Sequence, residues 1–158
     1  MSQLIVDKIV NLLDSFGVPY ELQDHEPTPT SEDSAKVRGT PMEQGRKAMI
    51  LKGRKSGKRI MIVIQSSERI DMKKVKAYFQ EDFEFEKPEI ILQDFGIEIG
   101  GIPPLGNVLG LETYFDKQNL KEKTAAFNCG LKTKSIIMSV EDLIKVVKPT
   151  IVDFKKDL

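Results

Sequence analysis

Two stretches of the chain carry the residues best suited to chemistry. The first is residues 98–106, Glu-Ile-Gly-Gly-Ile-Pro-Pro-Leu-Gly, which holds three of the 11 glycines and two of the 8 prolines. Glycine lets a ligand approach the main chain and proline fixes the backbone, so this composition predicts a rigid, narrow loop with N–H groups that can face a guest. The same composition is also typical of a tight turn between two strands.

The second stretch is residues 46–52, Arg-Lys-Ala-Met-Ile-Leu-Lys, in which Lys47 opens an apolar strand. Side chains alternate along a strand, so Lys47 shares a face with Met49 and Leu51. Its ammonium group could extend from the start of the strand into solvent. Alternatively, it could reach into a pocket and hold a phosphate or a developing oxyanion. The residue types leave both interpretations open.

Other reactive side chains are few. His25 is the one histidine and precedes a Pro-rich loop, a setting more typical of a structural residue than of a catalyst. The Thr- and Ser-rich loop that follows it, with Thr30, is a plausible place for polar contacts to a ligand. Cys129 is the one cysteine and has no basic neighbour, which favours an inert buried thiol. The sequence therefore predicts no triad, metal site or cofactor, and an enzyme of this kind would use a lysine, main-chain donors and water.

The composition narrows the class of protein. The 158 residues suit one domain spanning residues 1–158, with a real core. The 24 basic and 24 acidic side chains cancel, which argues against coating nucleic acid by charge and leaves room for a few phosphate contacts. We expect no DNA partner. No segment has the length and apolarity of a signal peptide or a membrane span, so we expect a cytoplasmic protein without membrane contacts.

Periodicity predicts a mixed α/β fold: a single domain with a central mixed, largely antiparallel sheet surrounded by helices. An amphipathic helix over residues 4–16 ends at Gly17. Residues 47–51 and 60–64 form a hairpin in the middle of the sheet, since both faces are apolar. Further helices begin after Asp71, at Pro88 and after Ser139. Shorter strands are expected at residues 20–25, 83–85, 111–116, 125–128, 135–138 and 151–154.

The order of these landmarks resembles the YbaK/EbsC-type aminoacyl-tRNA deacylases, free-standing relatives of the editing domain of bacterial prolyl-tRNA synthetases. The resemblance covers nearly the whole chain, and its most specific parts are the lysine strand and the Gly-x-x-x-Pro loop. The matching segments are residues 25–27 with Thr30, 46–52, 68–71, 100–106, 127–130 and 138–143.

The resemblance implies a YbaK-like fold and roles for particular residues. Lys47 would be catalytic, holding the 3′ end of a mischarged tRNA or stabilising charge as the ester breaks. The loop would grip the aminoacyl group or the terminal ribose, and Asn128 lies near positions that shape the pocket in relatives. The implied substrate-binding residues are Gly100, Gly101, Ile102, Pro103, Pro104, Gly106, Asn128, Thr30, His25 and Ser135.

The resemblance implies a trans-editing hydrolase that removes an amino acid, expected to be small, from tRNA(Pro) or a related tRNA. The expected partners are the 3′ acceptor end of that tRNA and, as a second partner to test, an aminoacyl-tRNA synthetase. Asn-Cys-Gly-Leu-Lys at residues 128–132 replaces a Gly-Gly-Lys-Arg-Gly-like stretch found in several relatives, and Pro103 replaces a small polar residue. These departures bear on amino-acid specificity. Two alternatives are a non-catalytic adaptor that binds tRNA or a synthetase, and a hydrolase of another small ester.

Overall fold

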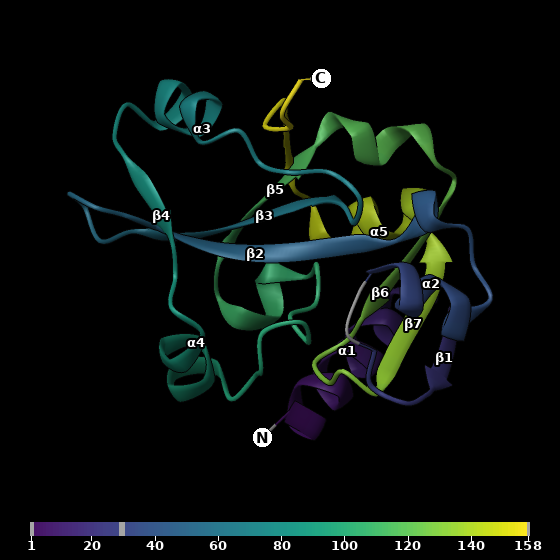
Figure 1. The fold of residues 1–158 in the computed structure, drawn as a ribbon. Helices are drawn as coiled ribbons and strands as arrows, with labels where there is room; N and C mark the ends of the chain where they lie inside the picture. Colours follow the sequence, from purple (N-terminus) through teal and green to yellow (C-terminus); the bar gives the residue numbers. More distant parts are fainter. Residues whose placement is uncertain (1, 29–30, 158) are drawn as a thin grey trace.

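The computed structural model describes residues 2–28 and 31–157, whose strands form two β-sheets (Figure 1). The larger sheet has the strand order β4-β2-β3-β5-β8. Strand β2 pairs antiparallel with β3 and β4, whereas the β3–β5 and β5–β8 pairs are parallel. The bounds are β2 (Arg46–Gly53), β3 (Arg59–Gln65), β4 (Phe83–Phe85), β5 (Glu112–Asp116) and β8 (Thr150–Val152).

The smaller sheet has the order β1-β7-β6, and both of its pairs are antiparallel. Its strands are β1 (Glu21–Asp24), β6 (Thr124–Asn128) and β7 (Lys134–Ser139). A parallel bridge between Gly45 and Ala126 brings the start of β2 next to β6. The predicted mixed, largely antiparallel α/β class is confirmed, with the strands divided between two sheets that meet at this bridge.

The helices begin where the sequence supplies caps. The Asp71 carboxylate accepts the N–H of Lys73 at 3.0 Å, and Ser139 Oγ accepts the N–H of Asp142 at 3.0 Å, as the sequence predicts. Among the described residues the α-helices are α1 (Ser2–Phe16), α2 (Ser31–Arg38), α3 (Met72–Phe79), α4 (Pro88–Phe95) and α5 (Val140–Val147). Short 3₁₀ turns are η1 (Met42–Gln44), η2 (Gly106–Leu109) and η3 (Lys117–Lys121). None of the helices described is long and apolar enough to cross a membrane.

The β2–β3 hairpin separates two hydrophobic cores. Ala48 and Ile50 face the larger core, which contains buried residues of α1, α5 and the smaller sheet. Leu51 faces the second core with Val75 of α3 and Phe154. Figure 1 shows α3 on one side of this hairpin and α4 on the other. The last strand ends at Val152, so Phe154 contributes to the core from the tail and not from a strand.

Candidate functional site

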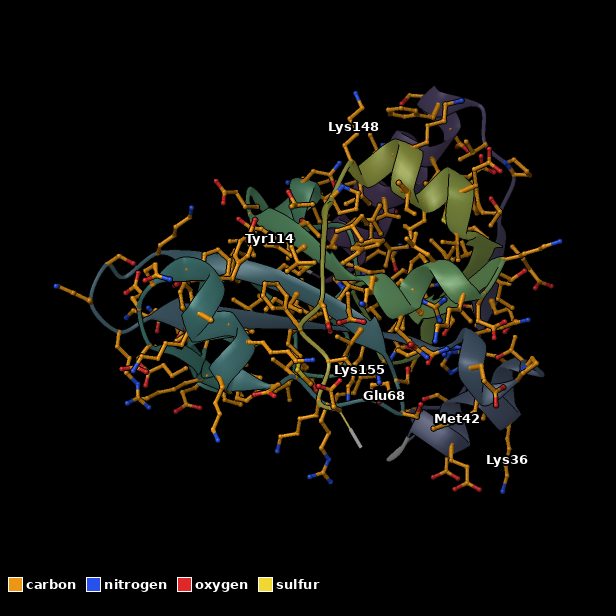
Figure 2. All side chains as sticks on the ribbon, turned by 90° about the horizontal axis from the view of Figure 1, so that it is seen from above. Lys36, Met42, Glu68, Tyr114, Lys148 and Lys155 are labelled. Carbon is orange, nitrogen blue, oxygen red and sulfur yellow. The ribbon has the colours of Figure 1, made fainter. Side chains whose placement is uncertain are left out.

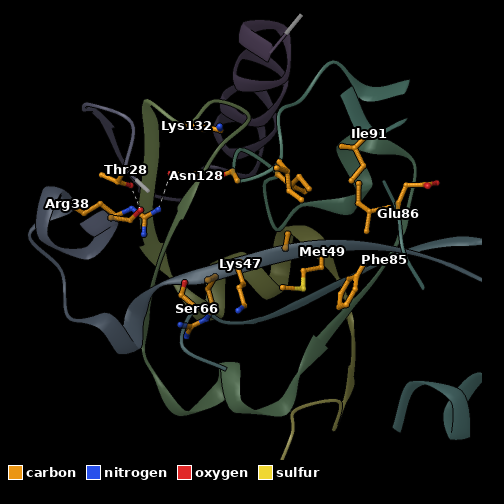
Figure 3. Close-up of a pocket in the computed structure, with 17 residues that line it drawn as sticks. Thr28, Arg38, Lys47, Met49, Ser66, Phe85, Glu86, Ile91, Asn128 and Lys132 are labelled. Atoms are coloured by element: carbon orange, nitrogen blue, oxygen red, sulfur yellow. Dashed lines mark hydrogen bonds between the residues drawn. The ribbon is translucent and has the colours of Figure 1, made fainter. Parts of the chain in front are cut away.

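A cavity of about 550 Å³ opens beside the first half of β2 (Figure 3). One part of its wall is polar and comes from α2, β6 and the start of β2. The other part is apolar and comes from β2, α4 and the Gly-Pro loop. The lining residues are Thr28, Ser34, Arg38, Arg46, Lys47, Ala48, Met49, Ile50, Ser66, Phe85, Glu86, Ile91, Ile99, Gly100, Ile102, Asn128 and Lys132.

The cavity lies along an open edge of β2. Strand β4 pairs with β2 only over Leu51–Gly53, and the N–H of Glu86 extends that pairing to the carbonyl of Ile50 at 2.9 Å. In an antiparallel ladder, alternate residues direct N–H and C=O to the same side. Ala48 therefore presents its backbone groups to the same edge, beyond the end of β4. These groups give the cavity wall a main-chain donor and acceptor.

Lys47 lies where the cavity bends round this edge. Its side chain and that of Met49 project from the same face of β2 (Figure 3). Alternation along the strand places Ala48 and Ile50 on the opposite face. The Lys47 side chain is half-buried. Burial, and then the positive charge of Arg69, lower the pKa of Lys47, while Glu68 raises it. A partly desolvated ammonium interacts more strongly with an anion than a hydrated one does.

Arg38 is the most unusual charge in the cavity wall. It ends α2, its side chain is only 8% exposed, and among the described residues it has no ion pair. Its Nε donates to Ser135 Oγ at 2.9 Å and its Nη2 to Asn128 Oδ1 at 3.0 Å, with a longer contact from Nη1 to the carbonyl of Ala126 at 3.5 Å. Burial lowers the pKa of Arg38 to about 10, so the group remains a cation at neutral pH.

Those contacts leave part of the Arg38 guanidinium available. The group has five N–H donors, and the described residues engage three of them. Within the described residues, one N–H on each Nη atom has no partner, and two such groups on one guanidinium can bind a phosphate or carboxylate together. A buried cation without a carboxylate partner costs stability, so its presence in a cavity wall points to an anionic ligand.

Asn128 connects Arg38 to the Gly-Pro loop. Its Oδ1 accepts from Arg38 and also from Ser135 Oγ at 3.1 Å, while its Nδ2 donates to the carbonyl of Gly100 at 2.5 Å. These partners fix the orientation of the amide. A second bond, from the N–H of Gly130 to the carbonyl of Gly101 at 2.8 Å, holds the loop against the β6–β7 turn. The loop is therefore positioned by the strand that also positions Arg38.

Within the predicted loop, Gly100 and Ile102 line the cavity, whereas four other candidates lie behind its wall. Gly101 packs closely, since a Cβ there would lie 3.2 Å from the carbonyl oxygen of Gly130. Gly106 is tighter still, because a Cβ would lie 1.9 Å from Thr113 Oγ1. Pro103 and Pro104 are both buried.

Two further candidates, Ser135 and His25, do not line the cavity and lie behind Arg38. Ser135 is fully buried, and His25 Nε2 lies 2.7 Å from its Oγ. His25 Nδ1 lies 2.8 Å from the carbonyl of Glu26, so Nδ1 must carry a proton there. His25 Nε2 therefore contacts the same hydroxyl that accepts from Arg38 Nε and donates to Asn128 Oδ1. The remaining candidate, Thr30, lies outside the described residues.

The one cysteine is not a nucleophile. Cys129 is fully buried, and burial raises the pKa of its thiol to about 12, so the thiol stays protonated. Among the described residues, no three His, Cys, Asp or Glu side chains gather as a metal site would require. The chemistry of the cavity therefore depends on its cations, hydroxyls and main-chain groups.

The charges lining the cavity are unbalanced although the chain as a whole is neutral. In the described part of the chain, Lys132 pairs with Glu98 at 3.1 Å, and the one carboxylate of the lining, Glu86, pairs with Arg59 at 3.7 Å. Arg38, Arg46 and Lys47 have no ion pair within the described residues. Arg46 donates to three backbone carbonyls, of Glu43, Gly45 and Asn119. A cation-lined wall facing an apolar one defines a site for a ligand that has both an anionic and an apolar part.

Sequence reasoning identified Lys47, Gly100, Ile102 and Asn128, which the structure brings to one cavity, and missed the two arginines. Arg38 ends a short polar helix, where a cation is usually explained by the helix dipole and by solvent. Arg46 begins a strand next to Lys47, and nothing in the local pattern separates its role from that of the lysine motif. A usable signal for Arg38 was its spacing of four and three residues from the small residues Ser34 and Ala35, which places all three on one face of the helix, the face that is buried.

Comparison with known proteins identifies the class. The family described as the aminoacyl-tRNA editing domain matches residues 25–146. That match covers most of the chain and includes every element that lines the cavity. The chain therefore belongs to the aminoacyl-tRNA editing domain family, and the resemblance to YbaK-type deacylases is confirmed.

Particular relatives are similar along nearly their whole length. The multifunctional Ser/Thr-tRNA deacylase ProXp-y of Escherichia coli K12 is 23% identical over 153 residues, which cover 94% of this chain and 92% of that protein. The prolyl-tRNA editing protein ProX of Acetoanaerobium sticklandii is 22% identical over 145 residues, covering 89% and 88%. A crystal structure of a candidate trans-editing enzyme for prolyl tRNA synthetase superposes with a TM-score of 0.83 at 20% identity, covering 96% and 97%.

Proposed function

We propose that this protein hydrolyses the ester bond of mischarged aminoacyl-tRNA and so removes a small amino acid from tRNA(Pro) or a related tRNA. The observation that carries the proposal is the cavity beside β2, where uncompensated cations face an apolar wall in a protein of zero net charge. An aminoacylated 3′ end has the matching two parts, a phosphodiester and a small side chain. Relatives named as tRNA deacylases support the same activity.

The cavity suggests how the substrate would lie. The amino-acid side chain would contact the apolar wall around Ile91 and Ile102, and the terminal phosphate would face Arg38. The ester would then lie along the open edge of β2, between Lys47 and the Gly100 loop. The main-chain groups of Ala48 would be available to the aminoacyl group at this edge.

The chemistry would be direct hydrolysis. Water adds to the ester carbonyl carbon, and the bond from this carbon to the ribose oxygen then breaks. That oxygen leaves with a proton derived from the water, giving a free amino acid and an uncharged tRNA. Lys47 would stabilise the negative charge that develops on the carbonyl oxygen, a type of contribution that is commonly large. No strong protein base is required if groups of the substrate orient the water.

A separate hydrolytic site is useful because synthetases discriminate poorly among small side chains. One methylene in an apolar pocket changes binding by about 1–3 kcal/mol, which leaves a measurable error rate. A second pocket that accepts the wrong amino acid removes that error. The activity would be needed where tRNA is charged, so we expect the protein to act in the cytoplasm. A synthetase partner is a further proposal to test by co-purification with prolyl-tRNA synthetase.

The test is deacylation of Ala-, Cys-, Ser- and Thr-charged tRNA, with tRNA(Pro) included, by the wild-type protein and by Lys47→Ala. We expect turnover of at least one substrate and a loss of about 10²- to 10³-fold in the variant, as for removal of an oxyanion-stabilising donor. Lys52→Ala is the matched control, because Lys52 lies on the same strand and is exposed. Near-normal turnover by a folded Lys47→Ala protein would contradict the role of Lys47.

The same panel separates the hydrolase from an adaptor. A folded wild-type protein that binds uncharged tRNA but turns over no substrate would favour a non-catalytic binding module. Turnover of small aminoacyl esters that lack any tRNA portion, at rates equal to those with tRNA, would favour a more general esterase.

A further inference from the structure

A second cavity adjoins the one described above and contains a different set of side chains. It has a volume of about 550 Å³ and lies between β2, the start of α3 and the C-terminal tail. It shares Lys47, Met49 and Phe85 with the first cavity, so the two meet at the edge of β2. Its own lining residues are Arg69, Ile70, Asp71, Met72, Lys73 and Lys156.

The charges of this second cavity are mostly positive. Arg69, Lys73 and Lys156 are exposed, and none has an ion pair within the described residues. The one carboxylate in the lining, Asp71, already accepts the N–H of Lys73 as the cap of α3. The neighbouring carboxylate of Glu68 lies 3.9 Å from Lys155, and Figure 2 shows these two side chains close together. The cations of the second cavity are therefore available to an external anion.

The boundary between the two cavities carries an exposed aromatic ring. Phe85 at the end of β4 is 51% exposed. Met49 and Met72 lie beside it, half-buried. Proteins bind single-stranded nucleic acids with this combination of an aromatic side chain and nearby cations, because the bases stack on the ring while the phosphates contact the cations.

Resting on the proposed function, we infer that the second cavity binds the single-stranded segment of the tRNA that precedes the aminoacylated nucleotide. Lys73, Lys156 and Arg69 contact its phosphates, and Phe85 stacks on one of its bases. The chain would then pass over Lys47 at the edge of β2 and deliver the ester to the first cavity. Chemistry and backbone recognition are thus divided between two faces of β2.

The experiment compares two substrates with the same ester: the aminoacylated tRNA and the aminoacyl ester of adenosine alone, which lacks this segment and the rest of the tRNA. The variant is the double substitution Lys73→Ala with Lys156→Ala, which removes two exposed cations and none of the residues shared with the first cavity. The matched control is Lys8→Ala with Lys145→Ala, which makes the same change in net charge on exposed positions of α1 and α5. Figure 2 shows Lys148, at the end of α5, far from Glu68 and Lys155.

We expect the Lys73/Lys156 variant to raise the KM for aminoacyl-tRNA by about tenfold at low salt, because two phosphate contacts are lost. The slope of log affinity against log salt concentration should also become shallower by about 0.7 for each lost contact. Turnover of the aminoacyl-adenosine should stay within twofold of wild type, as should both activities of the control. Equal losses on both substrates, or an equal loss in the control, would overturn the inference. Failure of the wild type to hydrolyse either substrate would instead contradict the proposed function, so the two failures are distinguishable.

Discussion

Arg38 combines a stability cost with a position in the cavity. Arg38 is 8% exposed, its guanidinium donates to neutral oxygens of Ser135, Asn128 and Ala126, and it has no ion pair among the described residues. Burial lowers its pKa to about 10, which means that the folded state disfavours the charged form. Because the charge persists at neutral pH, the fold carries this cost throughout the physiological range. Residues kept at such a cost are commonly functional.

We therefore predict that Arg38→Met separates stability from activity. Replacing a buried charge by an apolar side chain of similar length is often neutral or stabilising, so the free energy of unfolding should change by no more than about 1 kcal/mol. The kcat/KM for aminoacyl-tRNA should fall at least tenfold, because the fork that faces the phosphate is gone. Urea denaturation and deacylation assays on the same samples measure both quantities.

Arg38→Lys is the companion variant. Lysine keeps the positive charge but has a single ammonium group in place of the planar fork of arginine. It therefore cannot donate to Ser135 and Asn128 and also bind a ligand through two parallel hydrogen bonds. Its activity should lie between that of Arg38→Met and that of wild type. A strongly destabilised Arg38→Met protein with normal activity per folded molecule would show instead that Arg38 only ties α2 to the smaller sheet.

At the scale of elements, the Gly-Pro loop is held in place by β6, the β6–β7 turn and β5. Its glycines serve two purposes that sequence cannot separate: Gly100 has a φ of +95° at the cavity, while Gly106 packs against β5. We predict that Gly106→Ala destabilises the fold by about 1–3 kcal/mol through overpacking, since its Cβ would overlap Thr113 Oγ1. Deacylation per folded molecule should be close to normal. Adding Thr113→Ala should restore part of the lost stability, whereas a variant that is stable but inactive would place Gly106 in substrate binding.

The elements themselves were largely predictable, because each is encoded locally. The hairpin of β2 and β3 follows from alternation, and the caps at Asp71 and Ser139 follow from cap chemistry. The division of the strands into two sheets was not predictable, because local pattern does not say which distant strands pair. The contact that joins the sheets, the bridge between Gly45 and Ala126, likewise links residues far apart in sequence.

The site was predictable in part for the same reason. Lys47 stood out because a cation at the start of an apolar strand is locally anomalous. Arg38 did not, because burial of a helix-terminal arginine is decided by β6 and β7, which pack over it from a distant part of the chain. The Gly-Pro loop was noticed, but packing and ligand approach leave the same glycine signature.

For the whole molecule, the distribution of charge matters more than its sum. The 24 basic and 24 acidic side chains give zero net charge, so non-specific attraction to RNA should be weak. The cations without ion pairs that line the two cavities could still engage a few phosphates at one end of a tRNA. A footprint of this size has a measurable salt signature.

We predict that binding of uncharged tRNA weakens with salt with a log–log slope between about −2 and −3.5, the value for three to five phosphates of a single strand. Between 50 and 200 mM KCl the affinity should therefore fall by about 16- to 130-fold, measured by filter binding. A slope steeper than about −6 would require contacts along the duplex stem and so a larger surface than the two cavities provide. A slope near zero would remove phosphates from the interface, and recognition would then rest on the aminoacyl group and the terminal nucleoside.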